Sequence, residues 1–311
     1  MSALAHVPPP GTGAGPRPAP AARARGRWVP YLLLAPGLVW LALFFILPTI
    51  TLFSTSLQTG SLAAGYEQTF EFSNYTSAWS EYWPQLVRSF GYAGIATVAA
   101  LAIAYPLAYT IAFKAGKYRN VMLVLVIAPF YTSFLLRTLA WKTILADNGI
   151  IVETMERLGI LQVLSYVGLT ADDRVLATPL AVITGLTYNF LPFMTLPLYA
   201  SLERLDPRLV EAAGDLYASP ITAFRKVTFP LSLPGVVAGT LLTFIPAAGD
   251  YINAQLLGSL PATAMIGNVI DALFLRVLDY PRAAALSVTL MVVIVVMVAT
   301  YVRRAGTEEL V

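Results

Sequence analysis

Long apolar runs separated by short polar segments dominate this chain. Six of these runs reach the roughly 20 residues that a helix needs to cross a bilayer. They cover about 29–57, 87–113, 120–142, 176–201, 234–257 and 281–302. No segment shows the ten-residue alternation typical of a membrane barrel strand. Because backbone groups in lipid must be hydrogen-bonded internally, the pattern predicts an all-α, polytopic membrane protein with six transmembrane helices.

The composition agrees with this pattern and excludes most catalytic chemistry. Hydrophobic residues make up 57% of the chain and charged residues 12%, against roughly a quarter charged in soluble domains. There is no cysteine, and the single histidine, His6, lies in a segment rich in proline. Tyr118 follows Gly116-Lys117 where a phosphate-binding loop needs serine or threonine. We therefore expect no metal, no cofactor and no enzymatic activity, and any ATP hydrolysis is expected on a separate ATPase subunit.

The polar residues predict the topology and the domain limits. Residues 1–27, rich in proline and arginine, are expected to form a disordered cytoplasmic tail, 28–303 the six-helix domain, and 304–311 a second cytoplasmic tail. Basic residues gather beside alternate ends of the apolar runs, and acids at the opposite ends. The positive-inside rule then places both termini in the cytoplasm. The basic residues form no patch with interleaved aromatics, so we expect lipid as a partner and no nucleic acid.

The polar segment 203–230 predicts a loop that carries two short helices. Asp206-Pro207 and Ser219-Pro220 each place a capping oxygen before a proline at the first helical position. Pro230 is expected to end the second of these helices. We refer to this segment as the 203–230 loop.

The second helix of the loop has one apolar edge. Ile221, Phe224 and Val227 recur at helical spacing, and Arg225 and Lys226 lie elsewhere on its surface. A short amphipathic helix of this kind has three uses. It can lie on the bilayer surface, pack on its own bundle, or enter a groove of a partner protein.

The 203–230 loop resembles the EAA loop of ABC importer permeases. The family pattern is Glu-Ala-Ala, then glycine after three residues, and later Ile-x-Leu-Pro, with Val227 and Phe229 as mild departures here. Tyr217 stands at the glycine position, where a left-handed turn would strain a tyrosine, so the geometry of this turn stays open. The resemblance implies a loop that docks on an ATPase subunit. Its residues here are Glu211, Ala212, Ala213, Asp215, Tyr217, Ile221, Phe224, Val227 and Pro230.

Four further segments, 129–141, 147–149, 244–251 and 265–270, resemble the PotB-like permeases of spermidine/putrescine importers. The resemblance spans roughly 28–303 and implies a type I ABC importer permease fold in a bacterial inner membrane. It also implies a second, PotC-like permease, two ABC ATPase subunits and an extracytoplasmic substrate-binding protein as partners. The expected function is half of a translocation pathway for a small cationic solute, a polyamine. The alternatives are another small solute of a related importer, or a self-sufficient secondary transporter, which would predict inverted repeats.

Two ionisable residues lie inside apolar runs, where a charge is costly. Arg137 and Asp250 would each lie about 24 Å from the cytoplasmic end of their helices, at ~1.5 Å per residue. One interpretation is an intramembrane ion pair between them, or extension of each side chain to the outer surface. The other is that Asp250, with Tyr251 and Asn253, faces the translocation path and stabilises a cation.

Overall fold

The computed structural model describes residues 29–166 and 174–305. The predicted tail 1–27 therefore lies outside the described residues, as does 306–311 within the second predicted tail. The chain separates into two compact units, Met1–Thr51 and Leu52–Val311. Helices make up most of the described ranges, which confirms the all-α prediction.

The described residues of the first unit, from Val29 onward, form one uncharged helical run. It comprises α1 (Val29–Leu41), a π-turn η1 (Ala42–Ile46) and α2 (Leu47–Thr55), which runs four residues into the second unit. Leu47 donates its amide to the Ala42 carbonyl across the π-turn, and Pro48 follows directly. A proline inside a helix lacks the amide donor and crowds the preceding turn, so the wider turn before it relieves both problems.

The second unit begins with a hairpin and a very long helix. Strands β1 (Gln58–Ser61) and β2 (Gly65–Gln68) pair antiparallel, with Gln58 opposite Gln68. Helix α3 (Ser73–Phe113) has 41 residues and starts well before the predicted run 87–113. At ~1.5 Å per residue it is about 60 Å long, twice the thickness of a hydrocarbon core. Its amino-terminal part, 73–86, must therefore project beyond the membrane.

The predicted third span, 120–142, is not one straight helix. A short 3-10 turn η2 (Gly116–Tyr118) leads into α4 (Arg119–Ile127) and a second 3-10 turn η3 (Ala128–Tyr131), and α5 (Phe134–Ile144) follows. The chain bends by 95° between Gly116–Tyr131 and Phe134–Ile144. Pro129 lacks the amide that a regular helix needs, and Thr132 is extended. The described residues thus contain five helices able to cross a membrane, or six if the bent pair counts as one span.

Helices α8 (Pro179–Glu203) and α11 (Phe229–Ala248) pack with α3 to form the core of the second unit. A Cβ at Gly235 would lie 2.5 Å from Ser201 Cβ, and one at Gly239 would lie 2.9 Å from the Met194 sulfur. Only glycine permits this approach, as is typical of helix contacts in membranes. Small residues also line α3, where a fully buried stripe comprises Ala93, Ala96, Ala100, Ala104 and Ala108.

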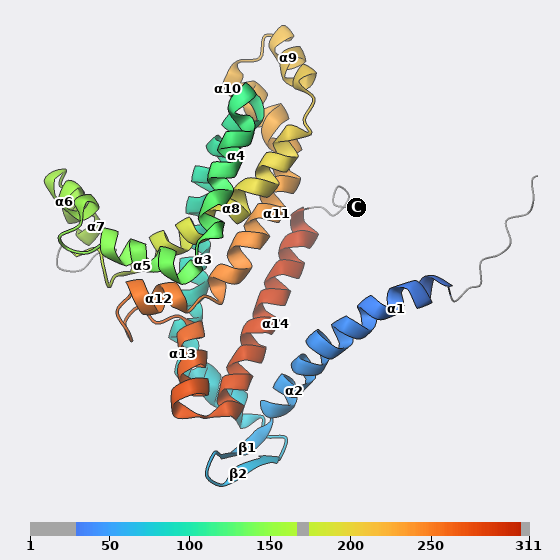
Figure 1. The fold of residues 1–311 in the computed structure, drawn as a ribbon, viewed down its shortest axis with the longest axis vertical. Coiled ribbons are helices and arrows are strands. Elements are labelled where there is room, and N and C mark those ends of the chain that lie inside the picture. The colour runs from blue at the N-terminus through green and yellow to red at the C-terminus, as the bar shows by residue number, and fades with distance from the viewer. Residues whose placement is uncertain (1–28, 167–173, 306–311) are drawn as a thin grey trace, which may run out of the picture. The chain divides into compact units, whose positions relative to one another are not determined.

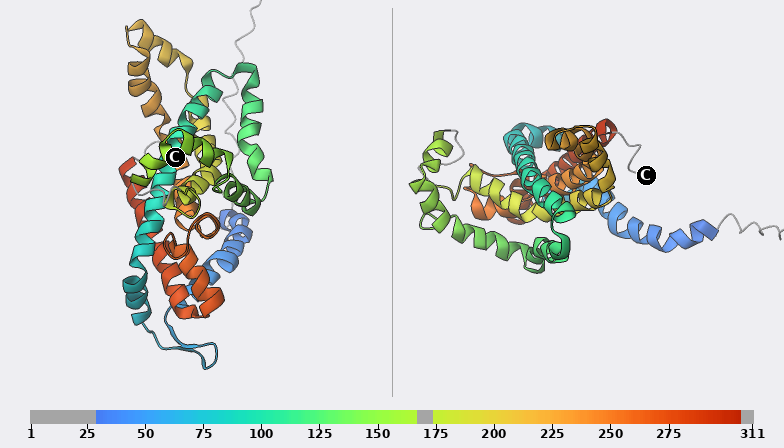
Figure 2. Two further views of the ribbon diagram at one scale, coloured as in Figure 1. Left: turned by 90° about the vertical axis from the view of Figure 1, so that its left-hand side faces the viewer. Right: turned by 90° about the horizontal axis from the view of Figure 1, so that it is seen from above.

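The remaining elements extend from this core, as Figure 1 shows. The short helices α6 (Ile150–Arg157) and α7 (Ile160–Tyr166) follow α5, and α9 (Pro207–Asp215) and α10 (Pro220–Ala223) connect α8 to the π-turn η4 (Phe224–Thr228). After α11 come α12 (Ile252–Leu257), α13 (Ile266–Ala272), η5 (Leu273–Val277) and α14 (Tyr280–Ala305). Helices α9 and α10 lie at one end of the second unit, and α13 lies toward the other end (Figures 1 and 2).

Candidate functional site

The 203–230 loop begins each of its helices as predicted. Asp206 Oδ1 accepts a hydrogen bond from the Arg208 amide at 3.0 Å, and Ser219 Oγ accepts one from the Thr222 amide at 3.3 Å. Each cap satisfies an amide that has no partner in the first turn of its helix. The loop therefore holds its shape through local hydrogen bonds.

The turn between the two loop helices is left-handed, although tyrosine occupies the glycine position. Tyr217 has φ 60°. Its amide donates to the Gly214 carbonyl at 2.9 Å, and the Ala218 amide donates to the Ala213 carbonyl at 3.0 Å. These two bonds define a Schellman motif, which ends α9 and satisfies its last carbonyls. The Tyr217 side chain is 99% exposed, so no contact within the described chain offsets its backbone strain.

The loop presents an exposed apolar surface beside exposed acids. Leu216 is 81% exposed and Ile221 is 71% exposed, and Glu211 and Asp215 of α9 are also exposed. The apolar edge predicted for Ile221, Phe224 and Val227 is divided, since Ile221 is exposed whereas Phe224 and Val227 are partly buried. Phe224 packs edge-on against Tyr105 at a centroid distance of 5.5 Å, whereas Ile221 faces outward.

Pro230 does not end the second loop helix, so that prediction is wrong. Residues Pro220–Ala248 form one continuous helical run. The Phe229 amide reaches the Phe224 carbonyl across the π-turn, and Pro230 follows at the start of α11. This is the same arrangement as in η1, and it accommodates the missing amide without breaking the helix. Helices α10 and α11 are therefore joined through η4 without a break.

The far end of α11 is broken at Asp250. The predicted span 234–257 ends at Ala248, and α12 starts at Ile252 in a different direction (Figure 1). Asp250 Oδ1 caps α12 by accepting the Asn253 amide at 2.8 Å and Asn253 Nδ2 at 3.2 Å. Asp250 is 9% exposed and Asn253 is fully buried. Both side chains are thus engaged inside the chain.

A buried chain of hydrogen bonds joins this break to the bent third span. Asn189 Nδ2 on α8 donates to Asn253 Oδ1 and to Thr138 Oγ1, each at 3.1 Å. Thr138 then donates to the Phe134 carbonyl at 3.1 Å, at the start of α5. The donors run outward from Asn189 in two directions, through Asn253 to the Asp250 carboxylate and through Thr138 to the Phe134 carbonyl. We call Thr138, Asn189, Asn253 and Asp250 the polar relay.

The ion pair considered for Arg137 and Asp250 is not formed within the described ranges. The prediction assumed two straight helices, whereas one is bent by 95° and the other ends before Asp250. The Arg137 guanidinium instead lies over two rings, 5.0 Å from the Phe130 centroid and 5.8 Å from the Phe134 centroid. Its Nε and Nη1 have no hydrogen-bond partner among the described residues.

Of the residues expected at the path, Tyr251 alone is well exposed, at 40%. It lines a cavity of about 280 Å³ together with Asp271 of α13, an acid that the sequence analysis did not single out. Asp271 lies one turn after Gly267 and next to Ile270, on an otherwise apolar stripe of α13. An acid on an apolar helical stripe is the signal that could have identified it.

Comparison with known proteins decides the family. Residues 100–305 match the family described as "binding-protein-dependent transport system inner membrane component". The chain belongs to this family. The spermidine/putrescine transport system permease protein PotB of Escherichia coli (strain K12) is 39% identical over 265 residues, which cover 85% of this chain and 93% of that protein. PotB of Haemophilus influenzae is 37% identical over 265 residues, with 85% and 90% covered.

Solved structures confirm the fold. A bacterial ABC transporter that imports the acidic polysaccharide alginate contains a chain that matches with a TM-score of 0.61 at 18% identity. The match covers 91% of this chain and 96% of that one. This permease family member is therefore an inner-membrane transport protein with a type I importer permease fold, and not an enzyme. The 203–230 loop and the polar relay both lie within the matched range 100–305.

Proposed function

We propose that this chain is one permease subunit of an ATP-driven polyamine importer and forms half of the translocation pathway. The observation that carries the proposal is the continuous helix Pro220–Ala248, which joins the exposed 203–230 loop to the break at Asp250. Force applied by an ATPase at the loop would move α11 as a lever and disturb the break at its other end. The chain itself contributes the lever, and the partner contributes ATP hydrolysis.

The relatives support the proposed substrate and partners. Two permeases at least 37% identical to this chain are named for spermidine and putrescine transport. The related alginate importer has been solved with a substrate-bound periplasmic protein. The proposed assembly contains this chain, a second PotC-like permease, two ABC ATPase subunits and an extracytoplasmic binding protein. The 203–230 loop and both termini lie on the cytoplasmic side, in agreement with the distribution of basic residues.

Uptake by the complete system tests the proposal. The chain is produced with its second permease, ATPase and binding protein in a bacterium that lacks its own polyamine uptake. We expect uptake of radiolabelled putrescine or spermidine, and its loss when the ATPase carries an inactivating substitution in its phosphate-binding loop. If the system takes up another solute but no polyamine, the proposed substrate is wrong. Uptake by this chain without the ATPase would contradict the ATP-driven mechanism and favour a secondary transporter.

A further inference from the structure

The cavity beside the break in α11 combines one carboxylate with aromatic and apolar walls. Its volume is about 280 Å³, and it is lined by Gly249, Tyr251, Gly267, Asp271 and Phe274, among others. Gly267, Asp271 and Phe274 recur at helical spacing along α13 and η5, and they therefore share one face. Asp271 is the single charged group that lines this cavity.

The Asp271 carboxylate has no hydrogen-bond or ion-pair partner among the described residues. The basic side chain of Arg282, at the start of α14, forms ion pairs with other acids. Its Nη1 lies 3.8 Å from Glu81 and its Nε lies 3.5 Å from Asp279. Asp250 also differs from Asp271, because its Oδ1 already accepts two hydrogen bonds from Asn253. The charge of Asp271 is thus available to a ligand.

The other walls also favour a cation. The rings of Tyr251 and Phe274 are 40% and 51% exposed, and aromatic faces attract an ammonium group. Gly249 is the carboxyl-terminal cap of α11, and that end of a helix carries a partial negative charge. A metal ion such as Mg²⁺ or Ca²⁺ needs several oxygen ligands, which one carboxylate and two rings do not supply. The walls suit an organic ammonium ion.

The backbone around the cavity is held in place. A Cβ at Gly267 would lie 2.8 Å from the Gly249 carbonyl oxygen and 3.1 Å from Tyr251 Cβ, so α13 meets the break at its glycine. Asn268 Nδ2 donates to the Tyr251 carbonyl at 2.8 Å, and Asn268 Oδ1 accepts the Met265 amide at 3.0 Å. The site is therefore formed by the fold itself.

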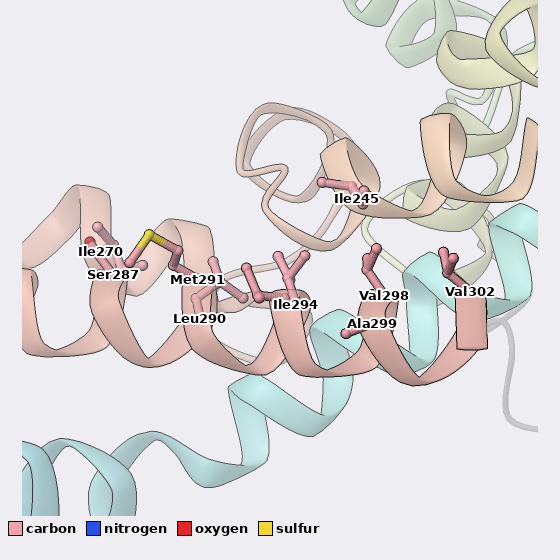
Figure 3. Close-up of a pocket in the computed structure, with 10 residues that line it drawn as sticks. Ile245, Ile270, Ser287, Leu290, Met291, Ile294, Val298, Ala299 and Val302 are labelled. Atoms are coloured by element: carbon pink, nitrogen blue, oxygen red, sulfur yellow. The ribbon is translucent and has the colours of Figure 1, made fainter. Parts of the chain in front are cut away.

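An apolar groove continues from the cavity along α14. It has a volume of about 720 Å³, and Ile270 and Leu290 line both the groove and the cavity (Figure 3). Figure 3 shows Met291 beside Leu290 and Ile294 one turn further along α14, in the same groove. An alkyl chain attached to an ammonium group at Asp271 would thus meet hydrocarbon.

We propose that this cavity is a binding subsite for a primary alkylammonium group, in which Asp271 pairs with the charge and Tyr251 and Phe274 enclose it. This inference rests on the proposed function and deepens it, because it assigns the amine end of the substrate to a particular carboxylate. The alkyl part of the ligand contacts Ile270 and Leu290.

The test uses the complete transporter in proteoliposomes with putrescine as the probe. Putrescine uptake and the ATP hydrolysis stimulated by the putrescine-loaded binding protein are measured in parallel. We expect Asp271→Asn to lower uptake about tenfold and Phe274→Leu about threefold, since charge pairing exceeds a single cation–π contact. Stimulated ATP hydrolysis should stay within about twofold of wild type, because α13 lies toward the opposite end of the second unit from the 203–230 loop (Figure 1). Asp271→Glu retains the charge and should keep most of the uptake.

Glu67→Gln, on the exposed hairpin strand β2, is the matched control and should leave uptake unchanged. Unchanged uptake in Asp271→Asn would overturn the subsite and leave the proposed function intact. A wild-type complex that does not transport putrescine would contradict the proposed function itself, and the subsite with it. Loss of both uptake and stimulated ATP hydrolysis in Asp271→Asn would overturn the subsite and assign Asp271 to the coupling of the two activities. Failure of both variants to assemble with the second permease would instead assign Asp271 to a subunit contact.

Discussion

The two ends of the helix Pro220–Ala248 differ in burial and in how their structure is held. At one end, the 203–230 loop is exposed and holds its shape through caps and a Schellman turn, all between residues close in sequence. At the other end, the break at Asp250 is buried, and Asn189, 61 residues before Asp250 in the chain, fixes it through Asn253. The loop is thus held by local hydrogen bonds, whereas the break is held by a buried polar network between residues far apart in sequence, where every partner matters. Changes at the break should therefore be costly, and changes in the loop mild.

The largest effect is expected for Gly185→Ala on α8, next to the polar relay. The added Cβ would lie 2.4 Å from Leu257 Cδ1 and 2.6 Å from Asn253 Oδ1. We expect a loss of about 2 kcal/mol in the free energy of unfolding, as is usual for an overpacked core. Unfolding of the purified chain in detergent, followed by circular dichroism, measures it.

Gly91→Ala on α3 is the matched control, because no atom lies within 4 Å of its added Cβ. It should be neutral or stabilise the helix by up to ~1 kcal/mol. Equal destabilisation by the two substitutions would show that the close contact at Gly185 is not what holds the break.

A smaller loss is expected for Asn189→Leu. This change leaves Asn253 Oδ1 and Thr138 Oγ1 without the donor that joins them. Buried polar groups that lose a partner cost about 1–2 kcal/mol, and somewhat less inside membranes. Putrescine uptake should fall as well, because Asn253, which donates to Asp250, loses the bond that holds it to α8. Thermal unfolding and putrescine uptake are measured on the same preparation.

Thr243→Val serves as the control for Asn189→Leu. Thr243 is fully buried, and its Oγ1 has no hydrogen-bond partner among the described residues. Removing this hydroxyl should leave stability unchanged or raise it slightly. If Thr243→Val and Asn189→Leu were equally harmful, the polar relay would have no special role.

The smallest effect is expected in the loop, and it has the opposite sign. Tyr217→Gly removes the strain of a side chain at φ 60° and should stabilise the turn by about 1 kcal/mol. The amide of Ala218, which donates across the turn, should then exchange its hydrogen about fivefold more slowly. Tyr217→Ala removes the ring but keeps the strain, so it should show no such protection. Slower exchange in both variants would attribute the effect to the ring.

The same contrast explains how much the sequence could predict. The apolar runs identify the helices, and Asp206 and Ser219 identify the loop helices, because these signals act within a few residues. The bend at Thr132 and the end of α11 at Ala248 were not predicted. The end of α11 depends on partners distant in sequence, such as Asn268 for Tyr251 and Asn189 for Asn253. The bend follows Pro129, whose effect on the helix a hydropathy pattern does not contain.

Two local expectations also failed for a physical reason. Pro230 was expected to end a helix, but the preceding π-turn accommodates it. Arg137 and Asp250 were considered as a pair because straight helices would place them at one depth, and neither helix is straight there. Turn types and helix bends are thus the features that a hydropathy pattern does not contain. The Tyr217 turn shows the converse, since a left-handed turn persists without its glycine.

Crosslinking from the loop tests the central claim most directly. The chain has no cysteine, so Ile221→Cys places a single thiol at a residue that is 71% exposed on the second loop helix. The complete transporter is treated with a short thiol-specific crosslinker, with and without ATP. The account predicts a crosslink to the ATPase subunit whose yield changes with nucleotide. A thiol that reaches only lipid-soluble reagents, with no crosslink to the ATPase in either state, would contradict it.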